Sequence, residues 1–168
     1  VAENVKGLLM RHNAESLKRV LADFRSLGYN VTFQLYNAAD FGVPQTRERV
    51  IIGGTRPGIP EFTPPFPLRL KENYVTAREA IDDLASMPEN TAFNHIWSRA
   101  NRSVDQGNRK LIADRPGYTI RAECHGNIQF HYMLPRRISM REAARFQSFP
   151  DNFIFDAKLR ETERQVGN

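Results

Sequence analysis

The chain has 168 residues, of which 40% are hydrophobic and 26% charged, which is enough for one domain or for part of a domain and a smaller second one. No apolar stretch reaches the ~18–20 residues that span a bilayer, so we expect no membrane partner. The single cysteine excludes an internal disulfide and fits a reducing cytoplasm. The net charge is +5, and between residues 94 and 145 ten Lys and Arg residues stand against four acidic ones, which suits either a phosphate-facing surface or a solvated basic face.

The first part of the chain is predicted to form a helix followed by two strands. Apolar residues recur at three- and four-residue spacing from residue 13 to 27, where Asn13 can cap an amphipathic helix and Gly28 can end it. Apolar and polar residues then alternate over 31–36, and a short β-branched run covers 49–54, so both segments are predicted strands. A helix and two adjacent strands could close the end of a larger α/β sheet.

The middle of the chain changes composition sharply. Five of the ten prolines fall within residues 57–67, where they disfavour both a helix and a central strand, and we place a domain boundary there. Residues 88–135 are polar and basic and predict loops with short strands at 118–122 and 128–134.

Two capping-box patterns predict short helices on either side of this polar region. In each, a Ser or Thr side chain and a Glu three residues later can satisfy each other's backbone donors. The first pattern joins Thr76 to Glu79 and predicts a helix to about Leu84. The second joins Ser139 to Glu142 and predicts a helix to about Gln147, which Pro150 stops.

Three short motifs stand out, and the first two of them carry side chains suited to catalysis. The first is Glu3-Asn4-Val5, the second is Gln45-x-Arg47-x-Arg49 with the lead-in Asn37-Ala-Ala-Asp-Phe-Gly-Val-Pro44, and the third runs from Arg141 to Pro150. Alternation along a strand would point Gln45, Arg47 and Arg49 to one face, where two planar guanidinium donors suit an oxygen-rich ligand. The two arginines also fit an exposed strand on which they pair with nearby acidic residues.

In this order, the three motifs resemble signature blocks of the DNA (cytosine-5) methyltransferases, and Gln165–Asn168 is similar to the opening of the family's final block. The resemblance implies an α/β fold, with residues 1–56 as the C-terminal part of a Rossmann-like methyltransferase sheet. Residues 57–137 would be a small, irregular α+β target-recognition domain, and residues 138–168 a segment returning to the catalytic domain. The family's cofactor loop and Pro-Cys-Gln nucleophile would precede residue 1, so we expect a C-terminal portion that is inactive alone.

The chemistry of cytosine methylation assigns roles to the first two motifs. Carbon C5 becomes nucleophilic when a thiolate adds at C6 while an acid protonates N3, and that acid needs a raised pKa to hold its proton near neutral pH. The resemblance implies that Glu3 is this acid and that Arg47 and Arg49 contact the target cytosine, with Arg49 on O2. The implied cofactor is S-adenosylmethionine, whose site lies mostly outside this chain, and Asn168 is the one cofactor contact expected within it.

The implied partner is double-stranded DNA, from which the target base must be flipped out. Thr119 fits a recurring recognition-domain threonine that contacts the DNA backbone. Arg121, Arg136 and Arg137 are candidates for base or phosphate contacts by side-chain type. Three further candidates of the same kind are His125, Asn127 and His131. All of them also fit ordinary loop positions.

The single cysteine and the four histidines do not indicate a second catalytic or metal site. Cys124 lacks the Pro and Gln that flank the family's nucleophile, and we interpret it as a non-catalytic thiol. The four histidines and one cysteine show no zinc-ligand spacing, so we predict no metal. A bacterial, cytoplasmic modification enzyme fits best, with the missing N-terminal catalytic half on the same chain or a separate subunit. Alternatives are the recognition subunit of a split enzyme, a non-catalytic DNA-binding remnant, and an RNA cytosine-5 methyltransferase.

Overall fold

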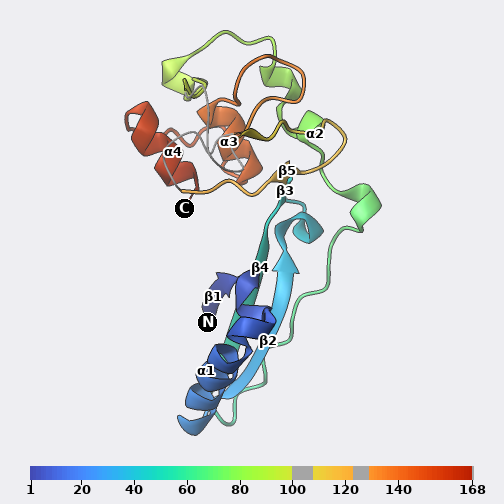
Figure 1. The fold of residues 1–168 in the computed structure, drawn as a ribbon, viewed down its shortest axis with the longest axis vertical. Helices are drawn as coiled ribbons and strands as arrows, with labels where there is room; N and C mark the ends of the chain where they lie inside the picture. Colours follow the sequence, from blue (N-terminus) through green and yellow to red (C-terminus); the bar gives the residue numbers. More distant parts are fainter. Residues whose placement is uncertain (100–107, 123–128, 168) are drawn as a thin grey trace.

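A computed structural model describes residues 1–99, 108–122 and 129–167, which form two lobes (Figure 1). The sheet lobe, residues 1–56, contains a three-stranded sheet and one long helix. The helical lobe, residues 71–167, contains the remaining α-helices, and an extended connection joins the two. In the part of the chain that the structure describes, no helix is long and apolar enough to cross a membrane.

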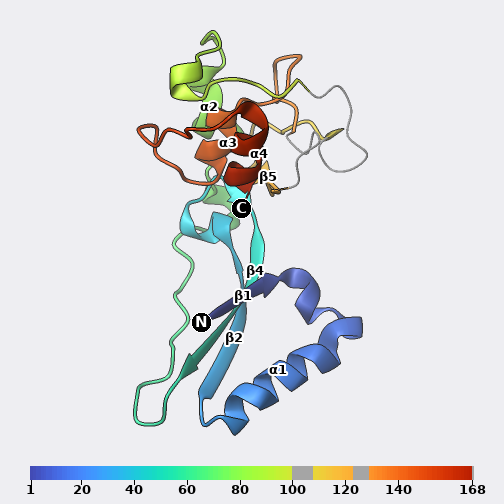
Figure 2. The same ribbon diagram turned by 90° about the vertical axis from the view of Figure 1, so that its left-hand side faces the viewer.

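The sheet lobe is a three-stranded antiparallel sheet with a helix on one face. Its strands β1 (Ala2–Val5), β4 (Glu48–Thr55) and β2 (Asn30–Asn37) lie in the order β1-β4-β2. Helix α1 (Ala14–Ser26) follows the expected amphipathic pattern and lies against one face of the sheet (Figure 2). Its buried side chains, together with their partners on β4, are Leu17, Leu21, Val50 and Ile52. The predicted helix and both predicted strands are therefore confirmed.

The two ends of α1 depend on local backbone geometry. Asn13 occupies the N-cap position, but its side chain donates a 2.8 Å hydrogen bond to the carbonyl of Gly7 instead of capping the helix. Gly28 follows the helix with a φ of 84°, a left-handed conformation that side chains disfavour. The chain can therefore turn sharply into β2.

The proline-rich segment leads the chain from the far end of β4 up to the helical lobe without forming a helix or strand (Figures 1 and 2). It lies against the sheet lobe at two places. The ring of Phe62 covers Gly53, where an added Cβ would lie 3.1 Å from Phe62 Cδ1. The backbone amides of Leu68 and Arg69 donate to the carbonyl of Asp40 at 2.8 and 2.9 Å.

The helical lobe packs three short helices around one hydrophobic core. These are α2 (Ala77–Ile81), α3 (Met140–Phe146) and α4 (Leu159–Gly167). Both predicted capping boxes form, at Thr76 and at Ser139. The core residues are Ala77, Ile81, Leu111, Ile120, Ile138, Met140, Ala143, Ala144, Phe146, Phe155 and Val166. Residues from 57–137 and from 138–168 thus share this core, and the division between those segments stays a prediction.

A two-stranded parallel sheet connects the lobes. It pairs β3 (Gln45–Thr46) with β5 (Gly117–Tyr118), in the register Gln45 with Gly117 and Thr46 with Tyr118. The close approach of α3 favours glycine at position 117, since an added Cβ would lie 2.9 Å from the ring of Phe146. The fold class is the predicted one, a mixed α/β fold with a small sheet and few helices.

Several predicted boundaries were wrong. Of the expected strand at 118–122 only Tyr118 pairs, as the second residue of β5, and within the described residues 129–134 only Phe130 forms isolated bridges. Helix α3 does end close to the predicted position, at Phe146 with Gln147 as its C-cap, but Ser148 already turns the chain before Pro150 with a left-handed φ of 64°. Helix α4 was not predicted at all, since half of its buried face consists of Thr162 and Glu163 and has no apolar repeat.

Candidate active site and nucleic-acid interface

A pocket of about 660 Å³ lies at the junction of the two lobes. It combines one wall from β1 and β4 with a second wall from the segment after β5. The side chains and backbone that line it come from Val5–Gly7, Thr46–Arg49, Arg109, Tyr118–Ala122 and Gly167. Four of the predicted functional residues, Arg47, Arg49, Thr119 and Arg121, therefore line one cavity, although 70 or more positions separate the two pairs in the sequence.

Glu3 reaches this pocket through an ion pair with Arg49. Strand β1 pairs with β4 so that Val5 lies opposite Arg49 and Glu3 lies opposite Ile51. Glu3 and Arg49 are therefore diagonal neighbours on the two strands, and their side chains lie close together. Arg49 Nε lies 2.6 Å from Glu3 Oε1, and Arg49 Nη1 donates to the carbonyl of Glu48 at 2.8 Å. The side chain of Glu3 is 53% exposed, so this structure does not provide the burial expected of a carboxyl group that keeps its proton.

Arg47 lies between β3 and β4, where its guanidinium spans the two walls of the pocket. Its Nη1 donates a 3.0 Å hydrogen bond to the carbonyl of Ile120. Burial and the nearby charge of Arg49 lower the pKa of Arg47, and the charge of Glu3 partly offsets this. Two neighbouring cations that are partly withdrawn from water would interact favourably with an oxygen-rich ligand between them.

Gln45 does not share the pocket face with the two arginines, contrary to the expectation from strand alternation. The chain leaves strand geometry at Arg47, because β3 pairs with β5 in one sheet and β4 pairs with β1 and β2 in the other. The side chain of Gln45 is fully buried and is bonded to α3 and to the backbone of Ile120. Only Arg47 and Arg49 of the motif therefore line the cavity.

Comparisons with known proteins identify the family of the chain. The family description "C-5 cytosine-specific DNA methylase" matches residues 1–116 and 97–168, which together cover the whole chain. The chain belongs to this family. It is 35% identical to the type II methyltransferase M.NgoFVII of Neisseria gonorrhoeae and 35% identical to M.BsuRI of Bacillus subtilis, in each case over 100% of its own length. It covers 54% and 45% of those two proteins, so it spans about half the length of the curated relatives that it matches.

Solved structures show the same fold. A prophage-encoded DNA modification methyltransferase from E. coli superposes with a TM-score of 0.70 at 18% identity, covering 99% of this chain and 63% of that protein. The Dnmt2 methyltransferase of S. pombe superposes with a TM-score of 0.62 at 17% identity, covering 98% of this chain and 58% of that protein. At these identities the likeness concerns the fold alone.

Thr119 and Arg121 lie on the second wall of the pocket, which follows β5. The hydroxyl of Thr119 donates a 2.7 Å hydrogen bond to the carbonyl of Thr46, so in this structure it fastens the two walls together. The backbone of Arg121 packs directly on Gly167, where an added Cβ would lie 2.2 Å from the carbonyl carbon and oxygen of Arg121. A role for either side chain in contacting DNA stays a prediction.

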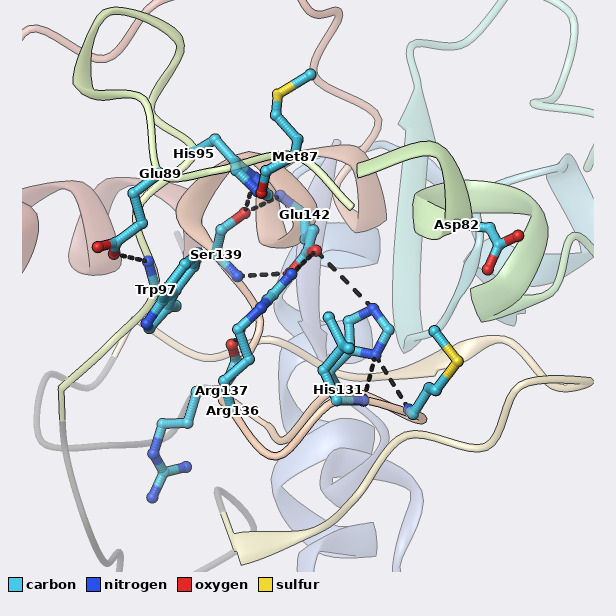
Figure 3. A network of polar contacts seen from close by, with 12 residues as sticks. Asp82, Met87, Glu89, His95, Trp97, His131, Arg136, Arg137, Ser139 and Glu142 are labelled. Carbon is cyan, nitrogen blue, oxygen red and sulfur yellow. Dashed lines mark hydrogen bonds and ion pairs between the residues drawn. The ribbon is translucent and has the colours of Figure 1, made fainter. Parts of the chain in front are cut away.

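Arg136 and Arg137 lie inside the helical lobe rather than on a phosphate-facing surface. Arg136 binds both carboxylate oxygens of Glu142 at 2.8 Å and stacks on Trp97, with 4.7 Å between the guanidinium carbon and the ring centroid (Figure 3). Arg137 is only 2% exposed, and its guanidinium lies 4.4 Å from the ring centroid of Phe130. Burial lowers the pKa of Arg137. This arrangement gives no support to DNA contacts by these two arginines.

Two further arginines of the basic block also act within the fold. Arg141 is fully buried and donates to three backbone carbonyls, those of Phe93, Pro150 and Phe153. Arg145 forms ion pairs with Asp83 and Asp151, at 2.5 and 2.7 Å. The charge excess counted along the sequence is therefore larger than the charge available on the surface of this lobe.

His131 is a fully buried histidine in an irregular segment of the helical lobe, where it packs inside the fold. Its Nδ1 accepts hydrogen bonds from the backbone amides of Met133 and Leu134 at 3.0 and 3.2 Å, which favours the tautomer protonated at Nε2 (Figure 3). Burial lowers the pKa of His131, which keeps the ring neutral. Cys124, His125, Asn127 and Asn168 lie outside the described residues. Among the described residues, no group of three or more His, Cys, Asp or Glu side chains could hold a metal ion.

Proposed function

We propose that the complete protein containing this chain transfers a methyl group from S-adenosylmethionine to C5 of a cytosine in a specific sequence of double-stranded DNA. The observation that carries this proposal is the Glu3–Arg49 pair beside Arg47 at the edge of the pocket between the lobes. The curated relatives, which are named type II methyltransferases, support the same reaction. A bacterial modification enzyme working in the cytoplasm fits these relatives.

The residues of this chain would serve the flipped base in three ways. Glu3 would deliver a proton to N3, while Arg49 would donate a hydrogen bond to O2 and stabilise charge that develops on the ring. Arg47, held by the carbonyl of Ile120, would fix the second side of the pocket. Because Glu3 now contacts Arg49 directly, an incoming cytosine would have to separate the pair, turning the guanidinium to O2 and the carboxyl group to N3.

A second polypeptide segment is needed to complete this site. Strand β1 pairs only with β4 among the described residues, so its other edge is available to extend the sheet. We place the missing N-terminal half there, carrying the thiolate nucleophile and most of the cofactor site. S-adenosylmethionine supplies the methyl group when bound, and we assign no described residue to it. Thr119 and Arg121 would contact DNA from the recognition side.

The test compares three samples incubated with labelled S-adenosylmethionine. The samples are this chain alone, the complete protein, and this chain mixed with a separately produced N-terminal half, each offered duplex DNA or transfer RNA. We expect label at C5 of cytosine in DNA with the complete protein and none with the chain alone. Labelling only in the mixed sample would instead identify a split enzyme. Labelling of RNA alone, or DNA binding without methylation by any sample, would overturn the proposal.

A further inference from the structure

The amide of Gln45 makes a set of hydrogen bonds that links three separate segments of the chain. Its Nε2 donates to the carbonyl of Phe146 and to Oε1 of Gln147, both at 2.8 Å. Its Oε1 accepts from the amide of Ile120 at 3.1 Å. Both N–H groups and the oxygen of a fully buried side chain are thus engaged.

The direction of these bonds sets one orientation of the Gln45 amide. If the oxygen and nitrogen exchanged places, the NH₂ group would face the Ile120 amide and the oxygen would face the Phe146 carbonyl. Both contacts would be repulsive, and neither group could turn to water because the site is buried. The position of Ile120 relative to the end of α3 is therefore tied to this single side chain.

Ile120 in turn holds the guanidinium of Arg47. Its amide donates a hydrogen bond to Oε1 of Gln45, and its carbonyl accepts the 3.0 Å hydrogen bond from Arg47 Nη1. Gln45 and Arg47 are two positions apart in sequence, yet they reach the same residue of the helical lobe from opposite sides. A shift of Ile120 would move the guanidinium within the pocket.

The linkage continues from Gln45 to the last helix. Gln147 accepts from Gln45 and donates from its own Nε2 to the carbonyl of Val166 at 2.7 Å. The next residue, Gly167, packs on the backbone of Arg121 and lines the pocket. The path from Gln45 through Gln147 to α4 thus returns to the same wall that carries Thr119 and Arg121.

We propose that Gln45 is a positioning residue for methyl transfer, which acts by holding Ile120 and thereby placing the guanidinium of Arg47 against the flipped base. This inference rests on the proposed function. Gln45 touches no substrate; its effect reaches the reaction only through Ile120 and Arg47. Gln147 connects this hydrogen-bonded network to α4 through the carbonyl of Val166.

The central experiment is a double-mutant cycle in the complete protein with Gln45→Met and Arg47→Ala. Methionine keeps the length of the side chain and removes all three hydrogen bonds. We expect Gln45→Met to lower the single-turnover rate by about 10²-fold, the cost typical of a small misplacement of a catalytic group. DNA affinity should change little. In the Arg47→Ala background the same substitution should have almost no further effect, because the group that it positions is gone.

A separate readout tests the structural step without any activity. Loss of the Gln45 acceptor should speed hydrogen exchange of the Ile120 amide, measured on the peptide covering residues 117–122. Gln34→Met serves as the matched control, because Gln34 is an exposed strand glutamine on β2. It should alter neither the rate nor the exchange of that peptide.

The outcomes separate this inference from the proposed function. If the wild-type complete protein does not methylate cytosine, the proposed function fails, and unchanged exchange at Ile120 would still refute the role of Gln45. Equal losses of rate with and without Arg47 would show a general structural role and overturn the proposal. Should Gln45→Met not fold, Gln147→Met replaces it in the cycle, and its loss of rate should again depend on Arg47.

Discussion

At the scale of single residues, the proposed chemistry depends on an ion pair that the substrate has to take apart. Glu3 and Arg49 lie 2.6 Å apart, and Arg47 is held beside them by a backbone carbonyl. The proposed proton donor and the proposed hydrogen-bond donor to the base therefore lie next to each other. Which of the two controls the reaction rate can be tested by substitution.

Glu3→Gln in the complete protein should slow methyl transfer and leave DNA binding nearly intact. The amide keeps the shape of the carboxyl group but cannot deliver a proton, and general acid catalysis contributes typically ~10²–10⁴-fold. Single-turnover labelling with saturating DNA measures the loss. Glu15→Gln is the matched control, since Glu15 is also an exposed glutamate in an ion pair, at 2.8 Å from Lys18. Near-normal turnover of the Glu3 variant would exclude Glu3 as the acid.

Arg49→Ala and Arg121→Ala should damage different steps. Arg49 pairs with the proposed acid and would face O2 of the base, so its loss should lower the single-turnover rate more than DNA affinity. Arg121 lines the pocket wall that we propose contacts DNA, so its loss should weaken DNA binding more than the rate. Rates and dissociation constants for both variants decide the matter. Equal loss of binding with unchanged rates would contradict this division of the pocket.

At the scale of secondary-structure elements, helix α4 packs against the pocket wall that carries Thr119 and Arg121. Helix α4 has few apolar residues: Val166 and the partly buried Leu159 pack on the core, and Gly167 approaches the backbone of Arg121 closely. An added Cβ at position 167 would lie 2.2 Å from the carbonyl carbon of Arg121 and 2.3 Å from the amide nitrogen of Ala122. Both obstacles are backbone atoms, which cannot move aside as a flexible side chain can.

Gly167→Ala should therefore lower the free energy of unfolding by about 1–3 kcal/mol or more, the cost of overpacking a tight interface. Gly54→Ala is the control, because an added Cβ there would meet the Tyr29 side chain at an ordinary 3.7 Å. Urea denaturation of both variants measures the difference. Equal stability of the two would show that α4 does not approach the Arg121 backbone so closely in solution.

At the scale of the whole molecule, many charged and titratable groups are paired within the fold and are not free to contact DNA. Glu142 is fully buried, pairs with Arg136 and lies 3.9 Å from Nε2 of His131. Arg145 bridges two aspartates across the helical lobe. These internal pairs determine how stability should depend on pH and how DNA binding should depend on salt.

Stability should fall as pH drops below about 6.5, the ordinary pKa of histidine from which that of His131 is lowered. In this range His131 is protonated in the unfolded chain but not in the folded one, because burial and the two backbone donors at Nδ1 oppose protonation of the ring. The stabilising difference is fully present above pH 6.5 and is lost progressively toward the lower folded-state pKa. His131→Asn, whose Oδ1 can accept the same bonds, should flatten the profile measured by urea denaturation between pH 8 and pH 5. An unchanged profile would assign the effect to other groups, among them His95, whose pKa burial also lowers.

DNA binding should respond to salt less steeply than the number of arginines suggests. Each neutralised phosphate contributes a slope of roughly −0.9 in log K against log salt. Arg121→Gln in the complete protein should reduce the slope by about that amount. Arg145→Gln should leave the slope unchanged, because Arg145 is committed to Asp83 and Asp151. A reduced slope in the Arg145 variant would show that this guanidinium reaches the phosphates.

Local patterns in the sequence were enough to predict α1, β2, β4 and both capping boxes, because each depends on spacing within a few residues. The same holds for the two motifs that contain Glu3, Arg47 and Arg49, whose residue types suit a base pocket. Predictions failed where long-range contacts set the structure. The strand expected at 128–134 has no continuous partner strand among the described residues, and α4 is stabilised by packing on Arg121 rather than by an apolar repeat.

The sequence by itself determined the family and the identity of the two pocket arginines, since both are written in contiguous motifs. Only the tertiary structure decided which cations remain available to a ligand. Arg136, Arg137, Arg141 and Arg145 look like a basic surface in sequence, yet the fold places them against Glu142, an aromatic ring, backbone carbonyls and aspartates. Only the tertiary structure also revealed the position of Gln45, because the partners of its buried amide lie about a hundred residues away in the chain.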